Sequence, residues 1–554
     1  MFIHRNHIHI LIKASLTITV SGVFIANNTF AAPSMDEMWQ VIQEQQKTIE
    51  TLQRQLAGRD EQAQASGETG TGPVLHDLAK RVADNEARLE ATAETMDQRN
   101  SNTSGWWNRT SVGGYGSARF EVSNLDSQNT GFTHRRLVLA VNSQMMERLQ
   151  TYFELEFERF TVLELEKGIN AGAGDLELSQ AIEGSNGSEI SLEQAWARYA
   201  ISPALQLDFG ALLVPVGRFN IQHDDNQWVL PRRTLVDRGA PALPVASAWT
   251  EAGAGISGST TIGDFLVDYR LYAVNGAALD FEFEHELEIA SGAGVDTELE
   301  SVIEAEFGPS RGPFDGNAND SIAFTGRLGL RPVPGHEIAL SGYIGNYVPS
   351  FLGRDDSVWS VAIDGLHRIN GFDIEYEVVT THFDGLMDVA GAFAGRALNK
   401  DREINGVSED GAFATHKIKF TLSSNVMARN KTGYWIEIRR PFHIDLLNGT
   451  IFGHNFSEQM LIPVFRMEQV FFTDQLQGLE FDDASLNAVE TRNASINRAT
   501  LGLGYRPVPG WMIQLAGEYT WTSEDSLAGL TNYLPAGATE NDNLSLLLGV
   551  AFGF

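Results

Sequence analysis

The sequence predicts an all-β fold: a sixteen-stranded antiparallel transmembrane β-barrel preceded by a short N-terminal α-helical coiled coil. From residue 106 to the end, apolar and polar residues alternate with period two, which is typical of strands whose two faces meet different surroundings. After the first thirty or so residues, no segment approaches the roughly 18 uninterrupted apolar residues of a membrane-spanning helix. Strands of about 9–11 residues can still cross a bilayer.

The last predicted strand shows the alternation best. One face is apolar and consists of Leu544, Leu546, Leu548, Val550, Phe552 and Phe554. The other is small or polar and consists of Asn543, Ser545, Leu547, Gly549, Ala551 and Gly553. With its aromatic last residue, Phe554, this tail resembles the terminal strand by which outer-membrane barrel proteins are recognised during assembly. The resemblance implies that Phe554 is an assembly signal and that the barrel-assembly machinery is a partner.

Composition excludes several classes of function. The chain has 554 residues, 43% of them hydrophobic, which suits a large folded β protein. It has no cysteine, so disulfides, thiolate nucleophiles and cysteine metal sites are impossible. A formal net charge of -32 argues against nonspecific binding to nucleic acid, which needs a basic surface. We expect no cofactor and no dedicated metal site.

The N-terminus predicts a secretory signal peptide over residues 1–31. His4 and Arg5 precede a mostly apolar run at 10–26, and small residues place the cleavage site after Ala31. The alternative is an N-terminal membrane anchor. Lys13 and the many Ser and Thr residues make the run a poor spanning helix, which disfavours that alternative.

Residues 32–100 predict periplasmic coiled-coil segments with a Gly-rich joint near 58–73. The first apolar seam, at heptad spacing, is Met35, Met38, Ile42, Gln45, Ile49, Leu52 and Leu56. The second is Leu75, Leu78, Val82, Asn85, Leu89, Thr92 and Met96. About three heptads each are marginal for isolated coiled coils, so we expect support from oligomerisation of the following domain. The alternative, amphipathic helices lying on their own protein, stays open.

The region 106–554 predicts the barrel domain. Its sixteen candidate strands are centred near residues 115, 138, 155, 195, 209, 252, 269, 326, 340, 361, 376, 437, 465, 500, 516 and 549. Expected short turns are at 142–144, 201–204, 331–335, 368–371 and 506–510, two of them an Arg-Pro-Val-Pro-Gly repeat. Expected long loops are at 121–133, 161–190, 215–247, 275–320, 346–356, 382–432, 471–494 and 523–542. A strand-like stretch at 413–422 is assigned to a loop, because an extra strand would break the even parity.

The charged faces of the strands predict a water-filled interior. An Arg or Lys facing hydrocarbon near the midplane costs roughly 2–4 kcal/mol, so charges that alternate with apolar residues must point inward. Sixteen strands enclose more space than side chains alone fill, which favours an aqueous channel over a self-plugged barrel. The predicted lumen wall includes Arg136, Glu154, Glu156, Arg327, Arg331, Glu375, Glu377 and Arg498.

Tryptophans near the predicted strand ends indicate two interfacial girdles. Trp106, Trp107 and Trp511 lie beside the short turns, and Trp249, Trp359 and Trp521 lie at the opposite ends.

The stretch 211–255 contains Val-Pro-Val-Gly-Arg-Phe-Asn, Leu-Pro-Arg-Arg and Ala-Trp-Thr-Glu-Ala-Gly, and it is followed by Tyr-Ala-Val-Asn-Gly at 272–276. This resembles the family related to the phosphate-selective porins of Gram-negative bacteria. The resemblance implies a homotrimer in the outer membrane, in contact with lipid and lipopolysaccharide, with the third long loop folded inward. The implied pore-constriction residues are Arg218, His223, Asp224, Asp225, Arg232, Arg233, Asp237 and Arg238. Each could instead form an ion pair that anchors the loop.

Phosphate selectivity in that family needs a lumenal cluster of lysines and arginines. Here every lysine after the coiled coil falls in a predicted outer loop: Lys167, Lys400, Lys417, Lys419 and Lys431. Arg136, Arg198, Arg327, Arg331 and Arg498 could form an arginine ladder, but glutamates oppose it in the same lumen. We therefore do not predict a phosphate channel. The acidic run at 280–306 could collect Ca²⁺ or Mg²⁺, although a solvated loop is the favoured interpretation.

The sequence thus predicts a porin that passes small hydrophilic solutes or ions through a pore narrowed by the third long loop. The alternative is a structural outer-membrane tether that acts through its periplasmic coiled coil. A barrel enzyme is disfavoured, because no nucleophile with a nearby base stands out.

Overall fold

The computed structural model describes residues 109–554 except 127, 159–162, 173–174, 185–188, 291–297, 311–318, 406–415, 423–426, 445–446, 449, 451–455, 457–458, 483–484, 532 and 535–538. The predicted signal peptide, coiled coil, Trp106 and Trp107 lie outside the described residues. The described residues belong to a compact unit that spans Ser104–Phe554. Among them, no helix has the length and apolar character needed to cross a membrane.

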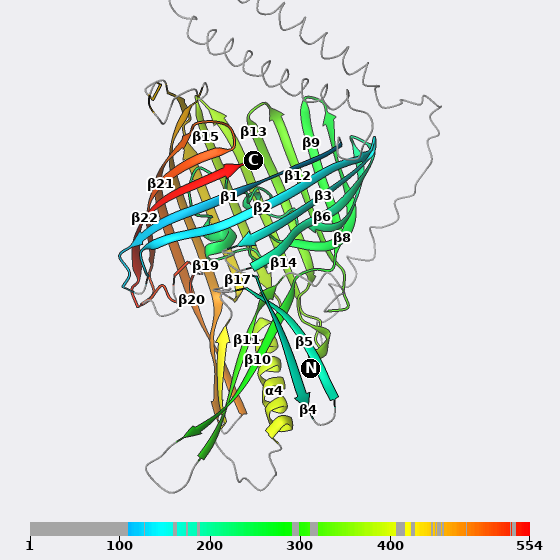
Figure 1. Cartoon of the computed structure of the whole chain (residues 1–554), viewed down its shortest axis with the longest axis vertical. Helices are drawn as coiled ribbons and strands as arrows, with labels where there is room; N and C mark the ends of the chain where they lie inside the picture. The colour runs from blue at the N-terminus through cyan, green and yellow to red at the C-terminus, as the bar shows by residue number, and fades with distance from the viewer. Residues whose placement is uncertain are drawn as a thin grey trace, which may run out of the picture. The chain divides into compact units, whose positions relative to one another are not determined.

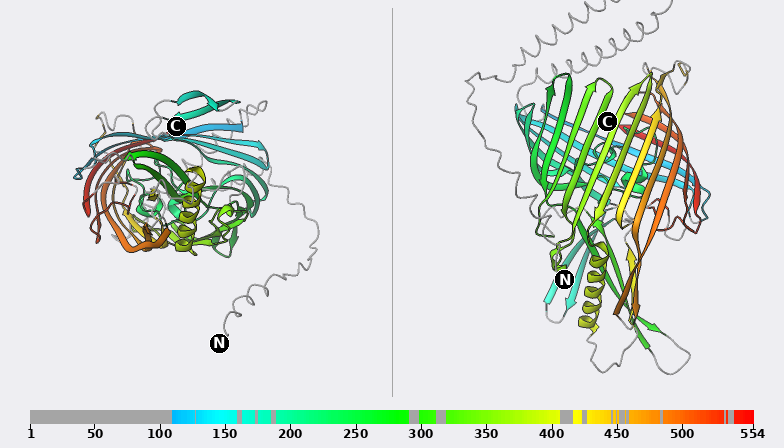
Figure 2. Two further views of the ribbon diagram at one scale, coloured as in Figure 1. Left: turned by 90° about the horizontal axis from the view of Figure 1, so that it is seen from below. Right: turned by 180° about the vertical axis from the view of Figure 1, so that it is seen from behind.

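Sixteen strands form a closed antiparallel ring (Figures 1 and 2). Each pairs with the next, in the order β1 (Thr110–Ser123), β2 (Gly131–Met146), β3 (Leu149–Glu158), β6 (Glu189–Ser202), β7 (Leu205–Leu213), β8 (Thr250–Ile262), β9 (Phe265–Val274), β12 (Ala323–Val333), β13 (His336–Asn346), β14 (Ser357–Ile369), β15 (Phe372–Phe383), β17 (Ala428–Arg439), β19 (Met460–Asp482), β20 (Ser485–Arg506), β21 (Trp511–Thr522) and β22 (Asp542–Gly553). The pairing of β22 with β1, from Tyr115 opposite Gly553 to Ser123 opposite Ser545, closes the ring. The predicted sixteen-stranded antiparallel barrel and all sixteen predicted strands are confirmed, and the predicted coiled coil stays a prediction.

The remaining elements belong to the connections. The long ones gather at the lower end of the barrel in Figure 1, where α4 (Leu386–Asn405), the β4 (Leu163–Gly172) and β5 (Asp175–Gly184) hairpin, β10 (Ala278–Ala290) and β11 (Glu298–Ser310) are drawn. The short elements are α3 (Arg218–Ile221), η2 (Leu235–Gly239), η3 (Ser350–Leu352), β16 (His416–Leu422) and β18 (Phe442–His443). β16 pairs in parallel with β11 and not with the ring, as the parity argument for 413–422 predicted.

Two predicted connections are wrong. The first short turn is not at 142–144, because β2 continues to Met146 and the chain reverses at 147–148. The expected long loop at 471–494 is mostly strand, because β19 and β20 stay paired from Gln475 opposite Arg492 to Asp482 opposite Ser485. The two strands stay hydrogen-bonded to each other and continue past the end of the ring as a two-stranded ribbon.

Glycine conformation explains the repeated short turn. In both copies of the Arg-Pro-Val-Pro-Gly sequence the glycine, Gly335 or Gly510, has φ of +84°. That left-handed conformation is favourable only without a β-carbon, so the glycine lets the chain reverse directly after a proline. Asn370 (φ +51°) and Gly371 (φ +80°) form a two-residue turn in which both φ are positive, as hairpins prefer.

The two faces of the barrel have inverted polarity relative to a soluble protein. Leu501 on β20 is 69% exposed, whereas its neighbour Thr500 is 1% exposed. On β22, Leu546 is 55% exposed and Ser545 is 3% exposed. An apolar exterior around a polar interior is the pattern of a barrel that spans a membrane.

The tryptophan girdle is confirmed only in part. Trp511 and Trp359 are 45% and 36% exposed on the outer face. Trp249 is fully buried and packs inside the ring against Tyr343, with ring centroids 4.6 Å apart. Its Nε1 donates to Glu251 Oε1 at 2.7 Å, so this tryptophan is an interior residue, because the connection that holds it folds inward.

We expect the substitution Leu501→Arg to lower the free energy of unfolding in lipid vesicles by about 2–4 kcal/mol. Leu501 lies midway along the β20–β21 pairing, which runs from Ile496 to Tyr505, so its side chain faces the centre of the bilayer. The matched control is Ile322→Arg, at an exposed apolar residue just before β12 at the rim of the long connections, where about 0–1 kcal/mol is expected. Urea titration of the refolded variants measures both, and equal losses would contradict a lipid-facing Leu501.

Candidate functional site

The connection between β7 and β8, residues 214–249, lies inside the ring, and we call it the lumenal segment. Its base is closed where Val214 N–H donates to the Trp249 carbonyl at 2.9 Å. Its residues contact inner-face side chains of strands on opposite sides of the ring, among them β2, β15 and β20. A segment that touches strands on opposite sides of a closed ring must lie within it (Figure 2).

The first part of the segment is fastened to β15. Arg218 N–H and Phe219 N–H both donate to Glu377 Oε2, at 2.7 and 3.0 Å. These are amide groups at the start of α3, which have no partner within the helix. Gly217 precedes them with φ of +76°, and a β-carbon there would come within 2.8 Å of Glu377 Oε1. A glycine is therefore required for the backbone to approach this carboxylate.

The Arg218 side chain joins the same wall. Its guanidinium pairs with Glu375 on β15, lies 3.1 Å from Glu337 on β13 and 3.7 Å from Asp364 on β14. Arg218 is 3% exposed. Burial alone would lower the pKa of Arg218, but Glu375, Glu337 and Asp364 raise it above its ordinary value, so the residue stays charged.

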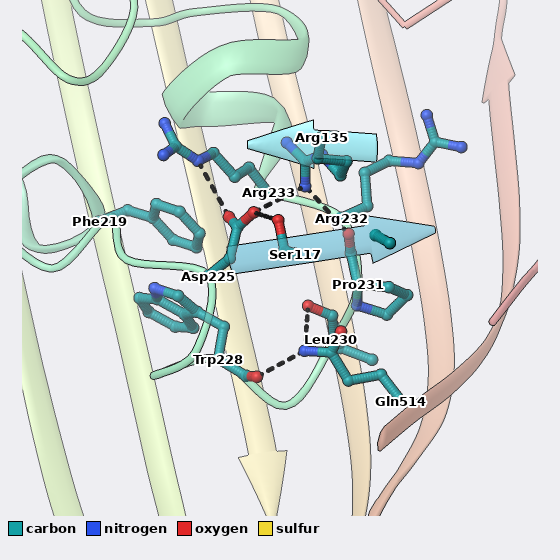
Figure 3. Close-up of a pocket in the computed structure, with 11 residues that line it drawn as sticks. Ser117, Arg135, Phe219, Asp225, Trp228, Leu230, Pro231, Arg232, Arg233 and Gln514 are labelled. Carbon is teal, nitrogen blue, oxygen red and sulfur yellow. Dashed lines mark hydrogen bonds and ion pairs between the residues drawn. The ribbon is translucent and has the colours of Figure 1, made fainter. Parts of the chain in front are cut away.

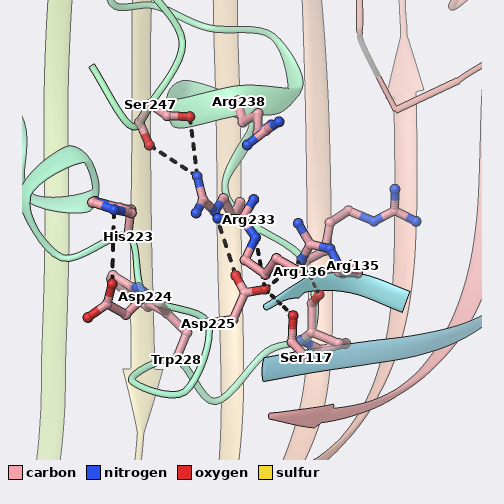
Figure 4. A network of polar contacts seen from close by, with 12 residues as sticks. Ser117, Arg135, Arg136, His223, Asp224, Asp225, Trp228, Arg233, Arg238 and Ser247 are labelled. Carbon is pink, nitrogen blue, oxygen red and sulfur yellow. Dashed lines mark hydrogen bonds and ion pairs between the residues drawn. The ribbon is translucent and has the colours of Figure 1, made fainter. Parts of the chain in front are cut away.

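Asp225 is the centre of a second network (Figures 3 and 4). Ser117 Oγ donates to Asp225 Oδ2 at 2.6 Å. The guanidiniums of Arg135, Arg136 and Arg233 lie 3.5, 3.6 and 3.7 Å from its carboxylate. Burial alone would raise the pKa of Asp225, but these three guanidiniums hold it well below its usual range. Asp225 is therefore a permanent anion that links the segment to β1 and β2.

Wall arginines also hold the backbone of the segment. Arg135 on β2, Arg466 on β19 and Arg498 on β20 donate to the carbonyls of Pro231, Arg232 and Arg233, at 3.2, 3.2 and 2.6 Å. Each carbonyl accepts a charge-assisted hydrogen bond, which is stronger than one between neutral groups. This side of the segment is fixed by main-chain contacts as well as by ion pairs.

The side chains of Arg232 and Arg238 pair with other parts of the wall. Arg232 pairs with Glu121 on β1 and lies 2.7 Å from Glu518 on β21. Arg238 lies 2.6 Å from Glu158 on β3 and is 26% exposed at its side chain. All three pairs join a predicted constriction residue to a lumen-wall carboxylate.

Asp224 and Asp237 have different surroundings. The side chain of Asp224 is 30% exposed and accepts from Gln227 Nε2 at 2.7 Å. Asp237 is buried, and burial raises the pKa of its carboxyl group. Asp224 is thus the more accessible carboxylate of the two.

His223 faces the wall at β6. Its Nε2 lies 3.1 Å from Glu193 Oε2, and its Nδ1 lies 2.8 Å from the Asn220 carbonyl oxygen. Burial alone would lower the pKa of His223, but Glu193 raises it to about 9. In the absence of a bound cation, the imidazole is therefore protonated at neutral pH.

The predicted wall residues are paired with opposite charges or bound by polar groups. Arg136 lies 3.0 Å from Glu156, Arg327 lies 2.5 Å from Asp364, and Arg498 lies 2.5 Å from Glu468. Glu154 instead accepts hydrogen bonds from the neutral Tyr152 and Gln194, at 3.1 and 2.7 Å. Arg331 differs in position, because its side chain is 44% exposed at the rim of the short turns, 3.3 Å from Asp268.

One lysine does not lie where the sequence predicted. Lys431 falls in the expected outer loop 382–432, but β17 begins at Ala428 and turns this side chain inward, fully buried. Its Nζ donates to the Leu243 carbonyl at 2.8 Å and lies 5.4 Å from the centroid of the Phe383 ring. Lys431 holds the lumenal segment and contacts a carbonyl instead of a carboxylate.

The sequence interpretation missed several residues that meet the segment. Arg466 and Glu468 on β19 bind the Arg232 carbonyl and the Leu235 amide, and Glu437 on β17 pairs with Arg466. All three alternate with apolar neighbours, so the period-two pattern could have found them. Tyr533 comes from the connection between β21 and β22, and its ring lies 4.8 Å from the Arg232 guanidinium. No local pattern signals that contact. Glu193 was missed because the alternation of β6 is broken at that residue.

The interior beside the segment is closely packed. Phe219 and Trp228 stack with ring centroids 4.0 Å apart, and Trp435 on β17 meets both edge-on. The cavity next to Asp225, lined in Figure 3 by Ser117 and Trp228 among others, has a volume of about 10 Å³. That is room for about one water molecule. The part of the lumen around Asp225 is therefore nearly filled.

No family model matches the chain. An uncharacterised protein of Aquifex aeolicus is 30% identical over 167 residues, which are 30% of this chain and 32% of that protein, so the match spans about a third of the relative.

Several solved structures align with most of the chain at low sequence identity. The anion-selective porin from Comamonas acidovorans is 10% identical and aligns over 80% of this chain and 99% of its own, with a TM-score of 0.41. A Salmonella typhi OmpF complex with daunomycin is 10% identical over 80% and 97%, with a TM-score of 0.40. The outer membrane channel DcaP of Acinetobacter baumannii is 11% identical over 80% and 97%, with a TM-score of 0.37. The strand pairings establish the barrel of this chain independently of these likenesses.

We expect Glu377→Ala to loosen the start of the lumenal segment. Two buried amides, those of Arg218 and Phe219, would lose their acceptor, which costs about 1–3 kcal/mol for an unsatisfied buried group. Hydrogen–deuterium exchange of the folded protein should therefore be faster in the peptide covering 217–221. The matched control is Asp373→Ala on the same strand, which contacts Arg368 and Arg439 and leaves this peptide unchanged. Equal exchange in both variants would show that Glu377 does not hold α3.

Proposed function

We propose that this protein is an outer-membrane porin that allows passive diffusion of small hydrophilic solutes or ions. The observation that carries the proposal is the closed sixteen-stranded ring with an apolar outer face and a charged inner face. Such a ring encloses more space than its wall side chains alone fill. Its interior suits water and its exterior suits lipid.

In this proposal the lumenal segment narrows the pore. The segment contributes Arg218, His223, Asp224, Asp225, Arg232, Arg233, Asp237 and Arg238, the residues that the sequence predicted for the constriction. Solute and ion passage would follow the space left between the segment and the wall, where the partly exposed Asp224 and Arg238 are accessible. A constriction selects by the charges that line it.

The proposed orientation follows from the connections. Barrels of this class have short turns on the periplasmic side and long loops outside, so Phe554 and the coiled coil would lie on the periplasmic side. The extended strand hairpin of β19 and β20, with α4 and the β10–β11–β16 sheet, would face outward toward lipopolysaccharide. A homotrimer, assembled with the barrel-assembly machinery, is part of the same proposal.

Planar bilayers containing the purified protein should show discrete conductance steps, and the reversal potential under a salt gradient should be small. Weak selectivity is expected because most buried arginines of the lumen pair with carboxylates, such as Arg327 with Asp364. A purified protein that never conducts would overturn the porin proposal and favour the alternative function, a structural outer-membrane tether. A strong anion preference would show that the acidic side chains lie outside the conducting path.

The substitution Arg238→Gln should shift the reversal potential toward cation selectivity. Arg238 lies 2.6 Å from Glu158, so its removal leaves this wall carboxylate less completely neutralised, with Arg136 at 3.8 Å. The matched control is Arg368→Gln, an exposed arginine 3.3 Å from Asp373 at the rim of the short turns, which should shift the potential less. Equal shifts would mean that the segment does not set the selectivity.

A further inference from the structure

We propose that Glu154, Glu193 and His223 form a binding site for a divalent transition-metal ion of the Zn²⁺ class. The three side chains come from β3, β6 and the lumenal segment, so a bound ion would join the segment to the wall. One potential ligand atom from each residue lies within 4.8 Å of the other two. All three residues are between 2% and 3% exposed.

The geometry lies within reach of metal coordination. Zn²⁺ binds His nitrogen and carboxylate oxygen at about 2.0–2.2 Å, which places ligands of a tetrahedral site about 3.3 Å apart. His223 Nε2 and Glu193 Oε2 are already 3.1 Å apart. Rotation of the Glu154 side chain brings the third ligand atom closer. Asp224 Oδ1, 3.9 Å from His223 Nε2, or a water molecule can take the fourth position.

A β-bulge brings the two glutamates to the same face. In the pairing of β3 with β6, Glu154 is opposite Gln194 and Leu155 is opposite Leu192, so Glu193 is the extra residue. Strict alternation from Gln194 would turn Glu193 outward. The bulge turns its carboxylate inward, and bulges re-aim side chains in this way beside functional sites.

The orientation of His223 is that of a metal ligand. Its Nδ1 lies 2.8 Å from the carbonyl oxygen of Asn220, which is not part of the cluster. Because a carbonyl oxygen can only accept, Nδ1 carries a proton and donates it to this hydrogen bond. Nε2 is left facing the carboxylates. Metal-binding histidines have this arrangement, in which the second nitrogen donates to a carbonyl or carboxylate and fixes the ring.

The site has an excess of negative charge. Both hydrogen bonds to Glu154 come from neutral groups and reach the same oxygen, Oε2, so Oε1 accepts none from the described residues. The nearby guanidinium of Arg136 pairs with Glu156 at 3.0 Å and Asp225 at 3.6 Å, and that of Arg233 lies 3.7 Å from Asp225. A buried carboxylate without a cationic partner is costly, and a divalent ion would neutralise it.

The donor set selects the class of ion. A site with imidazole and carboxylate ligands suits Zn²⁺ and its first-row neighbours. Ca²⁺ takes about 6–8 oxygen ligands, and this site offers fewer. The chain has no cysteine, so thiolates cannot supply a competing zinc site.

The test measures Zn²⁺ binding to the mature full-length protein, purified without a histidine tag and stripped of metal with a chelator. Competition with a chromophoric zinc chelator should show one site per chain in the wild type. Glu193→Gln and His223→Gln should each weaken binding at least tenfold. The matched control is His382→Gln, because His382 also faces a carboxylate, Asp384 at 3.0 Å, but at the rim of the long connections. This control should bind Zn²⁺ like the wild type.

Two results would overturn the site. One is a wild type that binds no Zn²⁺, which leaves an imidazolium–carboxylate pair between His223 and Glu193. The other is binding that persists unchanged in both site variants. Heat-modifiable migration and circular dichroism of each variant establish that it is folded, so lost binding can be assigned to lost ligands.

A second measurement separates this inference from the proposed function. If the protein conducts, Zn²⁺ should change the conductance of the wild type and leave the conductance of Glu193→Gln unchanged. Only in the wild type can the bound ion join the segment to the wall. This measurement rests on the proposed function. If the protein binds Zn²⁺ but never conducts, the site stands and the porin proposal fails. If the protein conducts but binds no Zn²⁺, the porin proposal stands and the metal site fails.

Discussion

Closure of the ring by β22 and β1 is the constraint on which the rest of the structure depends. In hydrocarbon, every backbone N–H and C=O must find a partner within the protein, and a sheet achieves this only when it has no free edge. Here the seam runs to the final residue, since Gly114 and Phe554 exchange two backbone hydrogen bonds, at 3.0 and 3.1 Å. Once the ring is closed, one face of every strand belongs to the exterior and the other to the enclosed space.

The enclosed face creates the second requirement, which is that buried charges find partners. Breaking a buried ion pair by removing one member costs about 3–5 kcal/mol, so an unpaired wall would be unstable. The lumenal segment supplies many of the missing partners, for example Arg232 to Glu518 and Arg238 to Glu158. The residues that suit a pore lining are therefore the same residues that hold the segment in place, and the two roles cannot be separated by position alone.

The sequence predicted the strands well, because alternation is a local property set by the two surroundings of each strand. It could not predict which charges meet. Arg218 and Glu375 are 157 positions apart, and their pairing follows from the path of the segment across the ring. Alternation did not predict the inward orientation of Glu193, because a β-bulge interrupts the strand there. Trp249 was expected at the membrane interface, but it lies inside the ring and donates to Glu251. Lys431 was predicted to lie in the outer loop 382–432, but its strand, β17, already begins at Ala428.

The segment is held unequally around the ring. At β15 a carboxylate binds two backbone amides, and at β2, β19 and β20 three guanidiniums bind three carbonyls. These contacts satisfy backbone groups and fix the chain path. At β6, His223 pairs with Glu193, and the neighbouring Glu154 on β3 is bound by neutral groups alone. Farther along β3, Arg238 of the segment pairs with Glu158. Because Glu154 accepts hydrogen bonds from neutral groups alone, a cation bound beside it would add a new attachment between the segment and this part of the wall.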